Sequence, residues 1–291
     1  MSSTAQYKSD RIFPQTPACD PPPARRGGFP NVVRLIREHP DFIRGLALII
    51  LILTAYRPAF HAGWIWDDDA YITNNSALRT VDGLKRIWTE PSVMTQYYPL
   101  TLTSFWAEEH LFGAAPYSFH RDNIFIHACN AVLLWLILQR LEVPAAWLIA
   151  AVWAVHPVNV ETVAWASERK NLLSGFFYLL ATLSYLPFVI NDQRWRPGRY
   201  FLSLFSFILA LFAKTVAATF PAAMLLLIWW KRGRIRRRDI VRIVPFLVAA
   251  IPMSYVTSYV EHMYIGARGP EFQYSFFHRW LIAAHAAWFY I

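Results

Sequence analysis

Long apolar stretches recur along this chain of 291 residues and constrain its fold more than any other feature. A helix that crosses a bilayer needs about 20 predominantly apolar residues. Within each stretch the apolar residues run continuously and do not alternate with polar ones, which argues against a membrane β-barrel. The candidate spans lie at about residues 42–60, 120–139, 145–160, 171–190, 200–213, 215–230 and 243–260, with a last run from Trp280 that the chain end truncates. The sequence therefore predicts an all-α polytopic membrane protein with about eight transmembrane helices.

The composition points to the same class. Hydrophobic residues make up 56% of the chain and charged residues 16%, whereas an ordinary soluble domain has about 45–50% and about 25%. The N-terminal part differs, because residues 1–40 are rich in Pro and Gly and show no apolar period. This composition is typical of a disordered segment. We expect a disordered cytoplasmic tail over residues 1–40 and one multi-pass membrane domain over residues 41–291.

The distribution of basic residues predicts an orientation. The net charge is +9, and the strongest basic run is KRGRIRRRDIVR at 231–242. Cytoplasmic loops carry an excess of Lys and Arg. If 200–230 were one helix of about 30 residues, it would be about 45 Å long, which is too long for a hydrocarbon core of about 30 Å. We therefore expect two helices there, and the basic run then falls on the cytoplasmic side. The N-terminus is then cytoplasmic, and the long loop 61–119, the segment 157–170 and the loop 261–279 lie on the outer face. We expect a bacterial inner-membrane protein that does not bind nucleic acid.

Three adjacent acids follow the first predicted span. Asp67, Asp68 and Asp69 come directly after Trp64 and Trp66, and tryptophan is enriched where the membrane meets water. In a partly desolvated site adjacent carboxylates cannot all ionise freely, so one acid can accept a proton near neutral pH. The alternatives are a solvated acidic run or a cap on the next helix. A divalent cation such as Mg²⁺ or Mn²⁺ would suit Asp67 and Asp68, but three adjacent acids do not establish a metal site.

Polar residues line one face of the second predicted span. The residues are His120, Asn123, His127 and Asn130, and at 100° per residue they fall within about 80° of one another. Polar groups in a spanning helix face the bundle or a cavity and avoid lipid, and they often form hydrogen bonds between helices. We expect His120 and Asn123 to line an outer-facing cavity, and the deeper Asn130 to hold helices together.

The segment HPVNVETVAWASERKN at 156–171 combines acids with cations. If it is helical from Asn159 onward, Glu161, Trp165 and Glu168 share one face. Arg169 and Lys170 follow, and two cations near a helix terminus can hold a phosphate. The alternative is an amphipathic turn at the interface with snorkelling cations. Lys214 lies alone in apolar surroundings, where a cation marks a functional position or snorkels from the tip of the helix pair.

Taken in order, these blocks resemble a known family. The blocks are WIWDDDAYITNN, IWTEP, QYYPLTLTSFW, PYSFHRDNIFIHACNAVLLW, AVHPVNVETVAWASERKNLLSGFFYLL and LFAKTVAATFPAAMLLLIWW. They are similar, over about residues 60–291, to the membrane half of the transmembrane and tetratricopeptide-repeat O-mannosyltransferases and their bacterial relatives. Those proteins are polytopic glycosyltransferases of the GT-C fold with a long first outer loop.

The resemblance implies a glycosyltransferase of the hexosyl-transferring class. It implies transfer of mannose or a similar hexose from a polyprenyl-phosphate donor to a protein or glycan acceptor on the outer face. The family's acidic pair maps onto Asp67 and Asp68, one of which is then the catalytic base. The leaving lipid phosphate is met by outer-face cations. The residues expected to bind substrate are His120, Asn123, His156, Glu161, Glu168, Arg169, Lys170 and Lys214.

Two other functions compete with this interpretation. A transporter or flippase for a lipid-linked sugar would use the same polar residues, but it should show paired broken helices in an internal repeat. A non-catalytic membrane scaffold would leave the acids after the first span without a purpose. Family members continue with further spans and tetratricopeptide repeats, and no such 34-residue repeat is found here. We therefore expect the chain to be a fragment of a longer protein or the product of a truncated reading frame, which leaves its activity by itself open.

Overall fold

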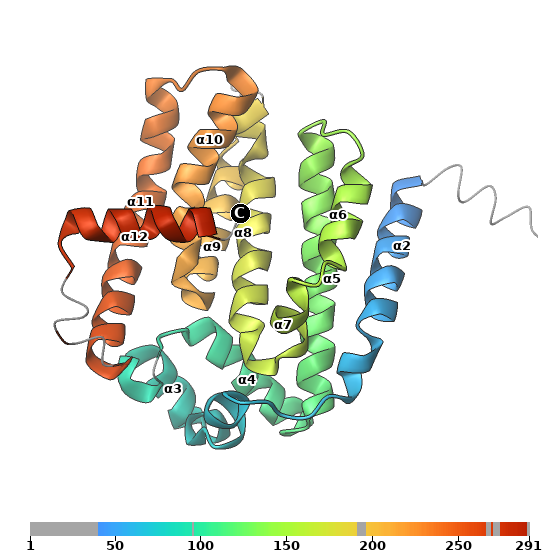
Figure 1. The fold of residues 1–291 in the computed structure, drawn as a ribbon, viewed down its shortest axis with the longest axis vertical. Coiled ribbons are helices and arrows are strands. Elements are labelled where there is room, and N and C mark those ends of the chain that lie inside the picture. Colours follow the sequence, from blue (N-terminus) through green and yellow to red (C-terminus); the bar gives the residue numbers. More distant parts are fainter. Residues whose placement is uncertain (1–39, 95, 191–195, 266–268, 270–273, 290–291) are drawn as a thin grey trace, which may run out of the picture. The chain divides into compact units, whose positions relative to one another are not determined.

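The computed structural model describes residues 40–94, 96–190, 196–265, 269 and 274–289, and this part of the chain contains helices and no strand (Figure 1). The chain divides into Met1–Pro40 and Asp41–Ile291. The predicted tail at 1–40 lies outside the described residues except for Pro40. The all-α prediction is confirmed for the described part.

Three helical segments of the described part are long and apolar enough to cross a membrane, at Pro116–Arg140, Ala166–Ile190 and Arg237–Met263. They mark the chain as an integral membrane protein. The other predicted spans correspond to shorter helices, so the expected number of about eight spans is not confirmed. The α-helices are α2 (Pro40–Ala55), α3 (Val81–Thr89), α4 (Pro99–Phe112), α5 (Pro116–Arg140), α6 (Ala146–Ala154), α7 (Asn159–Ala164), α8 (Arg169–Ile190), α9 (Pro197–Ala213), α10 (Phe220–Arg232), α11 (Arg237–Val260) and α12 (Phe276–Phe289).

The segment 200–230 forms two helices, as the length argument predicted. α9 ends at Ala213, Lys214 has an extended backbone, and the short helix Thr215–Thr219 leads into α10. Pro221 lies in the first turn of α10, where its missing N–H costs no helical hydrogen bond. Proline thus starts the second helix of the pair, and Lys214 lies at the turn.

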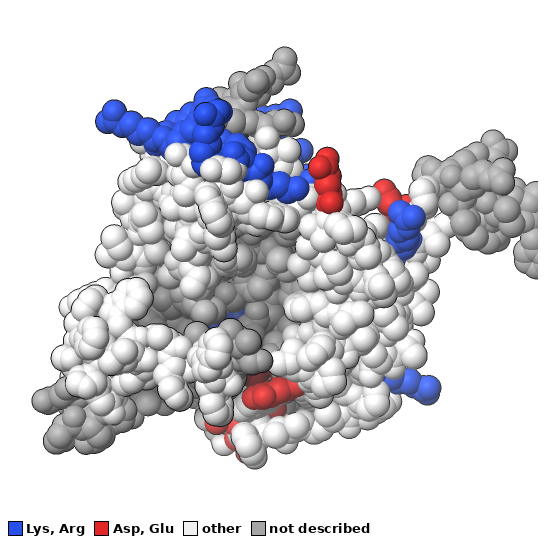
Figure 2. Space-filling model, turned by 45° about the horizontal axis from the view of Figure 1, so that its top comes forward, with Lys and Arg blue, Asp and Glu red and all other residues white. Residues whose placement is uncertain are grey.

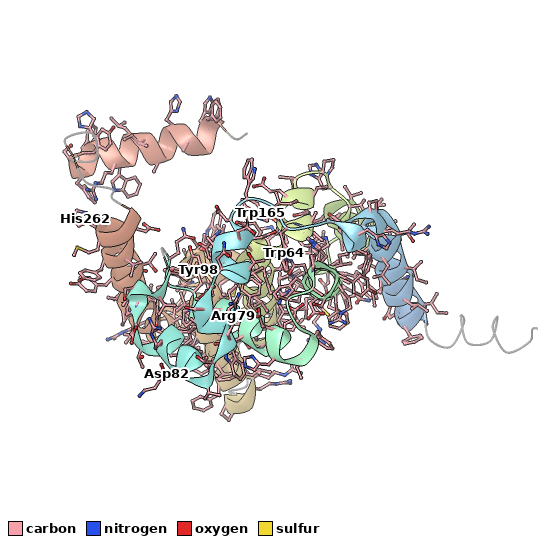
Figure 3. The ribbon with its side chains drawn as sticks, turned by 90° about the horizontal axis from the view of Figure 1, so that it is seen from below. Trp64, Arg79, Asp82, Tyr98, Trp165 and His262 are labelled. Atoms are coloured by element: carbon pink, nitrogen blue, oxygen red, sulfur yellow. The ribbon has the colours of Figure 1, made fainter. Side chains whose placement is uncertain are left out.

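The connections between helices gather at two ends (Figure 1). One end, the loop end, holds the segment 56–115, the α7–α8 connection, the α9–α10 turn and the C-terminus of α11. Figure 3 views this end and shows Trp64, Tyr98 and Trp165 on it, from three separate segments. The other end holds the α5–α6 and α10–α11 connections, and Figure 2 shows Lys and Arg gathered there. Of the segments predicted to share the outer face, the loop 61–119, the segment 157–170 and the start of the loop 261–279, at Glu261–Ile265, are therefore together at the loop end.

Three apolar clusters hold the helices and the loop end. One cluster packs aromatic rings of α8, α9, α10 and α11, among them Tyr185, Phe207 and Phe246. A second joins α2, α5 and α6 through small residues such as Ala131 and Ala150, which let helices approach closely. The third lies in the loop end itself and includes Ile72, Leu78, Phe105 and Phe119. The segment 56–115 therefore packs into a core of the loop end that can fix the positions of polar side chains.

Candidate active site at the loop end

The three aspartates lie in different environments. Asp68 is 0% exposed; its Oδ2 accepts the backbone N–H of Ile65 at 2.9 Å, and its Oδ1 accepts that of Ser167 at 2.8 Å. Asp67 and Asp69 are exposed. The alternative of a solvated acidic run therefore fits Asp67 and Asp69 and does not fit Asp68, which ties its loop to the segment just before α8.

This tie presents Trp66 on the surface in a strained conformation. Trp66 has φ +45° and is 82% exposed, and a bulky residue is seldom found in the left-handed region. The preceding residue is fixed as well, because the Trp165 indole N–H donates to the carbonyl of Ile65 at 3.1 Å. The rings of Trp66 and Trp165 meet edge to face, with centroids 5.7 Å apart and planes at 87°.

A groove of about 330 Å³ lies against these two rings. Its lining residues are Ile65, Trp66, Val160, Glu161, Ala164 and Trp165. We call it the tryptophan groove. Asp67 follows Trp66 directly in the chain and is exposed, although it is not among the lining residues. The exposed Glu161 lines the groove from the opposite segment.

The segment 156–171 is not one helix, which corrects the expected arrangement of its acids. α7 ends at Ala164, and Trp165 is extended, with φ −93° and ψ 117°. Glu161 and Trp165 both line the tryptophan groove, whereas Glu168 contacts Lys170 and Asn171 instead. The three residues therefore do not share one helical face, because the backbone changes direction at Trp165.

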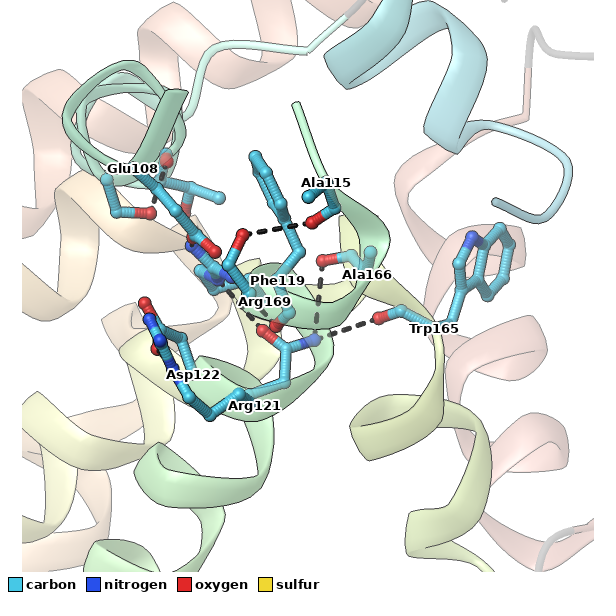
Figure 4. A network of polar contacts seen from close by, with 12 residues as sticks. Glu108, Ala115, Phe119, Arg121, Asp122, Trp165, Ala166 and Arg169 are labelled. Carbon is cyan, nitrogen blue, oxygen red and sulfur yellow. Dashed lines mark hydrogen bonds and ion pairs between the residues drawn. The ribbon is translucent and has the colours of Figure 1, made fainter. Parts of the chain in front are cut away.

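Arg169 is enclosed by protein groups (Figure 4). The side chain is 2% exposed. Its guanidinium donates to a carboxylate oxygen of Glu108, to Asn123 Oδ1 at 2.8 Å and to the Phe119 carbonyl at 2.9 Å. Burial raises the pKa of Glu108, and the charge of Arg169 opposes that shift. The expectation that Arg169 meets a substrate phosphate is corrected, since each of its three nitrogens already has a protein acceptor.

The polar stripe of α5 forms hydrogen bonds within the protein. The four side chains are all buried, and they contact backbone carbonyls: His120 Nε2 to Gly63 at 3.3 Å, Asn123 Nδ2 to Trp165 at 3.1 Å, His127 Nε2 to Ala154 at 2.8 Å and Asn130 Nδ2 to Leu172 at 3.0 Å. The prediction that they share a face is confirmed, and so is the interhelical role of Asn130. The prediction that His120 and Asn123 line a cavity is wrong, because packing leaves both 0% exposed.

His156 also has a local contact. It is exposed, and its Nδ1 accepts the backbone N–H of Val158 at 3.2 Å in the turn before α7. This contact stabilises the turn, and it does not bring the imidazole to the acids or cations described above.

Two lysines and an amide form a chain of polar contacts beside α8. Lys170 Nζ pairs with Glu168 at 2.7 Å and lies 5.0 Å from the centre of the Tyr71 ring. Asn171 donates to Glu168 and accepts from Lys214 Nζ at 2.5 Å. Burial lowers the pKa of Lys214, and Glu168 opposes that shift. Of the two lysines in this set of contacts, Lys170 is paired with a carboxylate and Lys214 contacts the Asn171 amide instead.

A second groove, of about 300 Å³, begins at this chain of contacts. Its lining residues are Trp153, Asn171, Ser174, Gly175, Tyr178, Leu179, Val216, Ala217 and Thr219. We call it the apolar groove, because most of these side chains carry no charge and little polarity. Figure 2 shows the surface hollowed between the helix groups, with a basic group visible inside the hollow. Ser174 donates to the Lys214 carbonyl at 3.3 Å and so fixes the turn at the head of this groove.

The acids of the loop end do not form a metal site. No group of three or more His, Cys, Asp or Glu side chains that could hold a metal ion occurs among the described residues. Both carboxylate oxygens of Asp68 accept backbone N–H groups in a buried position. Asp67 and Asp68 therefore do not fit a shared divalent cation, and we derive no metal-dependent step.

Sequence reasoning missed two polar residues that organise the site. Glu108 binds Arg169, and Asn171 links Glu168 to Lys214. The sequence signal for Glu108 is an acidic residue within the largely apolar segment that forms α4. Asn171 follows Arg169 and Lys170, and nothing in the sequence distinguishes it from other polar residues. Their partners lie 61 and 43 positions away in the chain, so spacing alone does not reveal them.

Comparison with known proteins finds similar chains in animals. The chain is 29% identical over 154 residues to "Protein O-mannosyl-transferase TMTC3" of Homo sapiens, covering 49% of this chain and 17% of that protein. It is 29% identical over 193 residues to "Protein O-mannosyl-transferase Tmtc1" of Drosophila melanogaster, covering 62% of this chain and 22% of that protein. It is 29% identical over 171 residues to "Protein O-mannosyl-transferase TMTC4" of Homo sapiens, covering 50% of this chain and 23% of that protein. These relatives confirm the resemblance derived from the sequence.

The matched region is a small part of each relative. The chain matches about a fifth of the length of these curated proteins. No family model matches the chain, and no solved structure matches it.

Proposed function

We propose that this chain belongs to a glycosyltransferase that moves mannose from a polyprenyl-phosphate donor to a hydroxyl of a protein on the outer face of the membrane. The observation that carries the proposal is the arrangement of the loop end. An exposed carboxylate, Asp67, stands on a loop fixed by buried hydrogen bonds. The same end carries the apolar groove, which is lined by Asn171, and Asn171 accepts a hydrogen bond from Lys214. The names of the relatives support the reaction class and the protein acceptor.

The apolar groove has the character that a lipid phosphate requires. Tyr178, Leu179 and Val216 offer apolar surface to an isoprenyl chain. Lys214 offers an ammonium group at the head of the groove, where a lipid phosphate would carry its charge. Lys170 is already paired with Glu168, so Lys214 is the cation that we assign to the phosphate.

The proposed reaction is a single displacement at the anomeric carbon. Asp67 takes the proton of the acceptor hydroxyl as that oxygen attacks the anomeric carbon of mannose. The bond between that carbon and the phosphate oxygen breaks, and polyprenyl phosphate leaves with the electron pair. Lys214 stabilises the charge on the leaving phosphate. A general base contributes about 10²–10⁴-fold, and fixed charges around the leaving group contribute a further large share.

The proposed orientation follows from charge. Lys and Arg gather at the end opposite to the loop end (Figure 2), and such clusters stay in the cytoplasm. The loop end is then outside, the N-terminus is cytoplasmic, and a bacterial inner membrane is the location that we propose. Trp64 and Trp66 would lie at the outer boundary of the bilayer.

A transfer assay tests the function. Membranes from cells that express the chain are supplied with radiolabelled mannose linked to a polyprenyl phosphate, and label in protein is measured. Membranes without the chain and membranes with Lys214→Ala are the controls, and nucleotide-linked mannose is the alternative donor. We expect label in protein only from the lipid-linked donor and only with the unmodified chain. If the labelled lipid crosses the membrane and no label reaches protein, the chain is a transporter. If the chain changes neither the label in protein nor the movement of the labelled lipid, both the transferase and the transporter are refuted.

A further inference from the structure

The tryptophan groove has features that neither packing nor an interfacial position explains. Trp66 is 82% exposed, so its ring contributes little to the core. Its backbone is nevertheless held in the left-handed region, at φ +45°, which is a strained conformation for a non-glycine residue. A tryptophan that only anchored the chain at the membrane surface would not require a strained backbone.

Four hydrogen bonds maintain this strained loop. Asp68 accepts from the backbone N–H groups of Ile65 and Ser167. The Asp68 N–H donates to the Ile65 carbonyl at 3.0 Å, and the Trp165 indole donates to the same carbonyl. Strain of this kind persists only where surrounding contacts over-determine it, and it concentrates at ligand-binding positions. The loop is therefore built to hold the Trp66 ring in one place.

The walls of the groove match the two kinds of surface of a sugar ring. The C–H face of a hexopyranose is apolar and packs on an aromatic face, while its hydroxyls donate to carboxylates. Trp66 and Trp165 stand nearly perpendicular and present an aromatic corner. Glu161 lines the same groove as an exposed carboxylate. The volume of about 330 Å³ is that of a small-ligand site.

We infer that the tryptophan groove is a binding subsite for one hexopyranose ring. The ring packs on Trp66 and Trp165, and Glu161 accepts hydrogen bonds from its hydroxyls. Asp67 follows Trp66 in the chain, so the subsite adjoins the loop that carries the residue assigned as the base. This inference rests on the proposed function for its choice of sugar. The ring can belong to the lipid-linked donor or to the mannosylated product, and the chemistry of recognition is the same for both.

Binding measurements on the full chain in lipid nanodiscs test the subsite without requiring turnover. The variant is Trp66→Gly, which removes the ring and relieves the strain, since glycine adopts positive φ freely. Trp66→Phe keeps an aromatic face, and Trp229→Ala removes an exposed tryptophan of α10 that lies outside the groove. The ligands are mannose linked through phosphate to a ten-carbon isoprenyl chain, the same isoprenyl phosphate without sugar, and a mannosylated threonine peptide.

The subsite predicts a loss that is specific to the sugar. Trp66→Gly should weaken binding of a mannose-bearing ligand about tenfold, which equals about 1.4 kcal/mol, and should leave binding of the isoprenyl phosphate unchanged. Its melting temperature should equal or exceed that of the unmodified chain, and Trp66→Phe and Trp229→Ala should bind sugar normally. Weaker binding of the donor alone assigns the ring to the donor, and weaker binding of the peptide alone assigns it to the product.

Two results would overturn the inference. Equal affinity of Trp66→Gly and the unmodified chain for both mannose-bearing ligands would show that no ring packs on Trp66. A lower melting temperature of Trp66→Gly with equal loss of all three ligands would show that Trp66 is a structural residue. If sugar binding depends on Trp66 and no mannose is transferred, the subsite stands and the proposed reaction fails. If mannose is transferred and Trp66→Gly binds sugar as well as the unmodified chain does, the proposed reaction stands and the subsite fails.

Discussion

Asp67 and Asp68 are neighbours in the chain, and the structure gives them different tasks. Asp67 is exposed and can reach a substrate, whereas both oxygens of Asp68 are occupied by backbone N–H groups. Only a residue whose oxygens are accessible can take a proton from an acceptor hydroxyl. We therefore assign the base to Asp67 and assign Asp68 as a positioning residue for the loop that carries Trp66 and Asp67.

Asp68→Asn should destabilise the protein. The Ile65 and Ser167 N–H groups each use a different carboxylate oxygen, and asparagine has an NH2 donor in place of one of those oxygens, so one N–H would lose its acceptor. A buried donor left without an acceptor costs about 1–3 kcal/mol. We expect a lower melting temperature in detergent and a lower membrane yield. Asp69→Asn is the matched control, since Asp69 is exposed, and equal stability of the two variants would contradict the positioning role.

Lys214 should make donor binding sensitive to alkaline pH. Burial favours the neutral amine and lowers the pKa of Lys214 below the ordinary value for lysine, which is about 10.4. As the pH rises through that lowered pKa, the ammonium is lost and the phosphate loses its partner. The KM for the lipid-linked donor should therefore rise at alkaline pH in the unmodified chain. In Lys214→Arg, which keeps its charge, the KM should not change with pH over this range. If the KM of both proteins rises in the same way with pH, the assignment of Lys214 is refuted.

At the scale of elements, the site depends on how α4, α5 and α8 are joined. Glu108 of α4 binds Arg169 at the start of α8, and Asn123 of α5 binds Arg169 and the Trp165 carbonyl. Rings of Phe105 and Phe119 lie 4.8 and 5.2 Å from the guanidinium carbon. This cluster holds the α7–α8 connection, and with it one wall of the tryptophan groove, against α4 of the loop end.

Breaking this buried pair should cost more than replacing it. Arg169→Met leaves the Glu108 carboxylate buried without its cation, which costs about 3–5 kcal/mol, whereas replacing both partners with apolar residues is often neutral. We expect Arg169→Met to melt well below the unmodified chain and the double variant Glu108→Leu with Arg169→Met to recover most of the loss. The measurement is the melting temperature of each purified variant, and additive losses in the double variant would contradict the account.

Sequence periodicity predicted some elements well for a physical reason. The four polar residues of α5 share a face because the helical repeat fixes their direction, and the structure confirms it. What faces them is decided by segments more than 20 residues away, so the pattern could not separate a cavity from a packed interface. The break at Trp165 was missed for a related reason, since no proline or glycine marks it and the Ser167 bond to Asp68 comes from 99 positions away.

At the scale of the whole chain, charge predicts which end faces the cytoplasm. The sequence predicted that three separate segments share one face, and two of them, with the start of the third at Glu261–Ile265, are together at the loop end. Apolar stretches and basic runs are sufficient for that prediction, because apolar stretches mark the segments that enter the bilayer and basic runs mark the loops on its cytoplasmic side. They are not sufficient for the number of spans, since several apolar stretches fold as helices of 9–17 residues. Nor do they locate the two grooves, which depend on side chains from several helices.

Cysteine accessibility in intact cells tests the orientation. Asp82→Cys places a thiol on the exposed surface of α3 at the loop end, and Arg234→Cys places one in the α10–α11 connection. Both are made in a chain whose two native cysteines are replaced. An impermeant maleimide should label position 82 and should label position 234 only after the cells are opened. Labelling of position 234 but not position 82 in intact cells would reverse the topology.

The central claim is that Asp67 is the base of a mannosyl transfer, and one comparison tests it most directly. Mannose transfer from the polyprenyl-phosphate donor is measured in membranes that contain equal amounts of the unmodified chain, Asp67→Asn or Asp69→Asn. Asparagine keeps the shape of the side chain and removes its basicity. The account predicts that Asp67→Asn loses about 10²–10⁴-fold in transfer rate at normal yield and melting temperature, while Asp69→Asn retains most of it. Full transfer by Asp67→Asn at normal yield would contradict the claim.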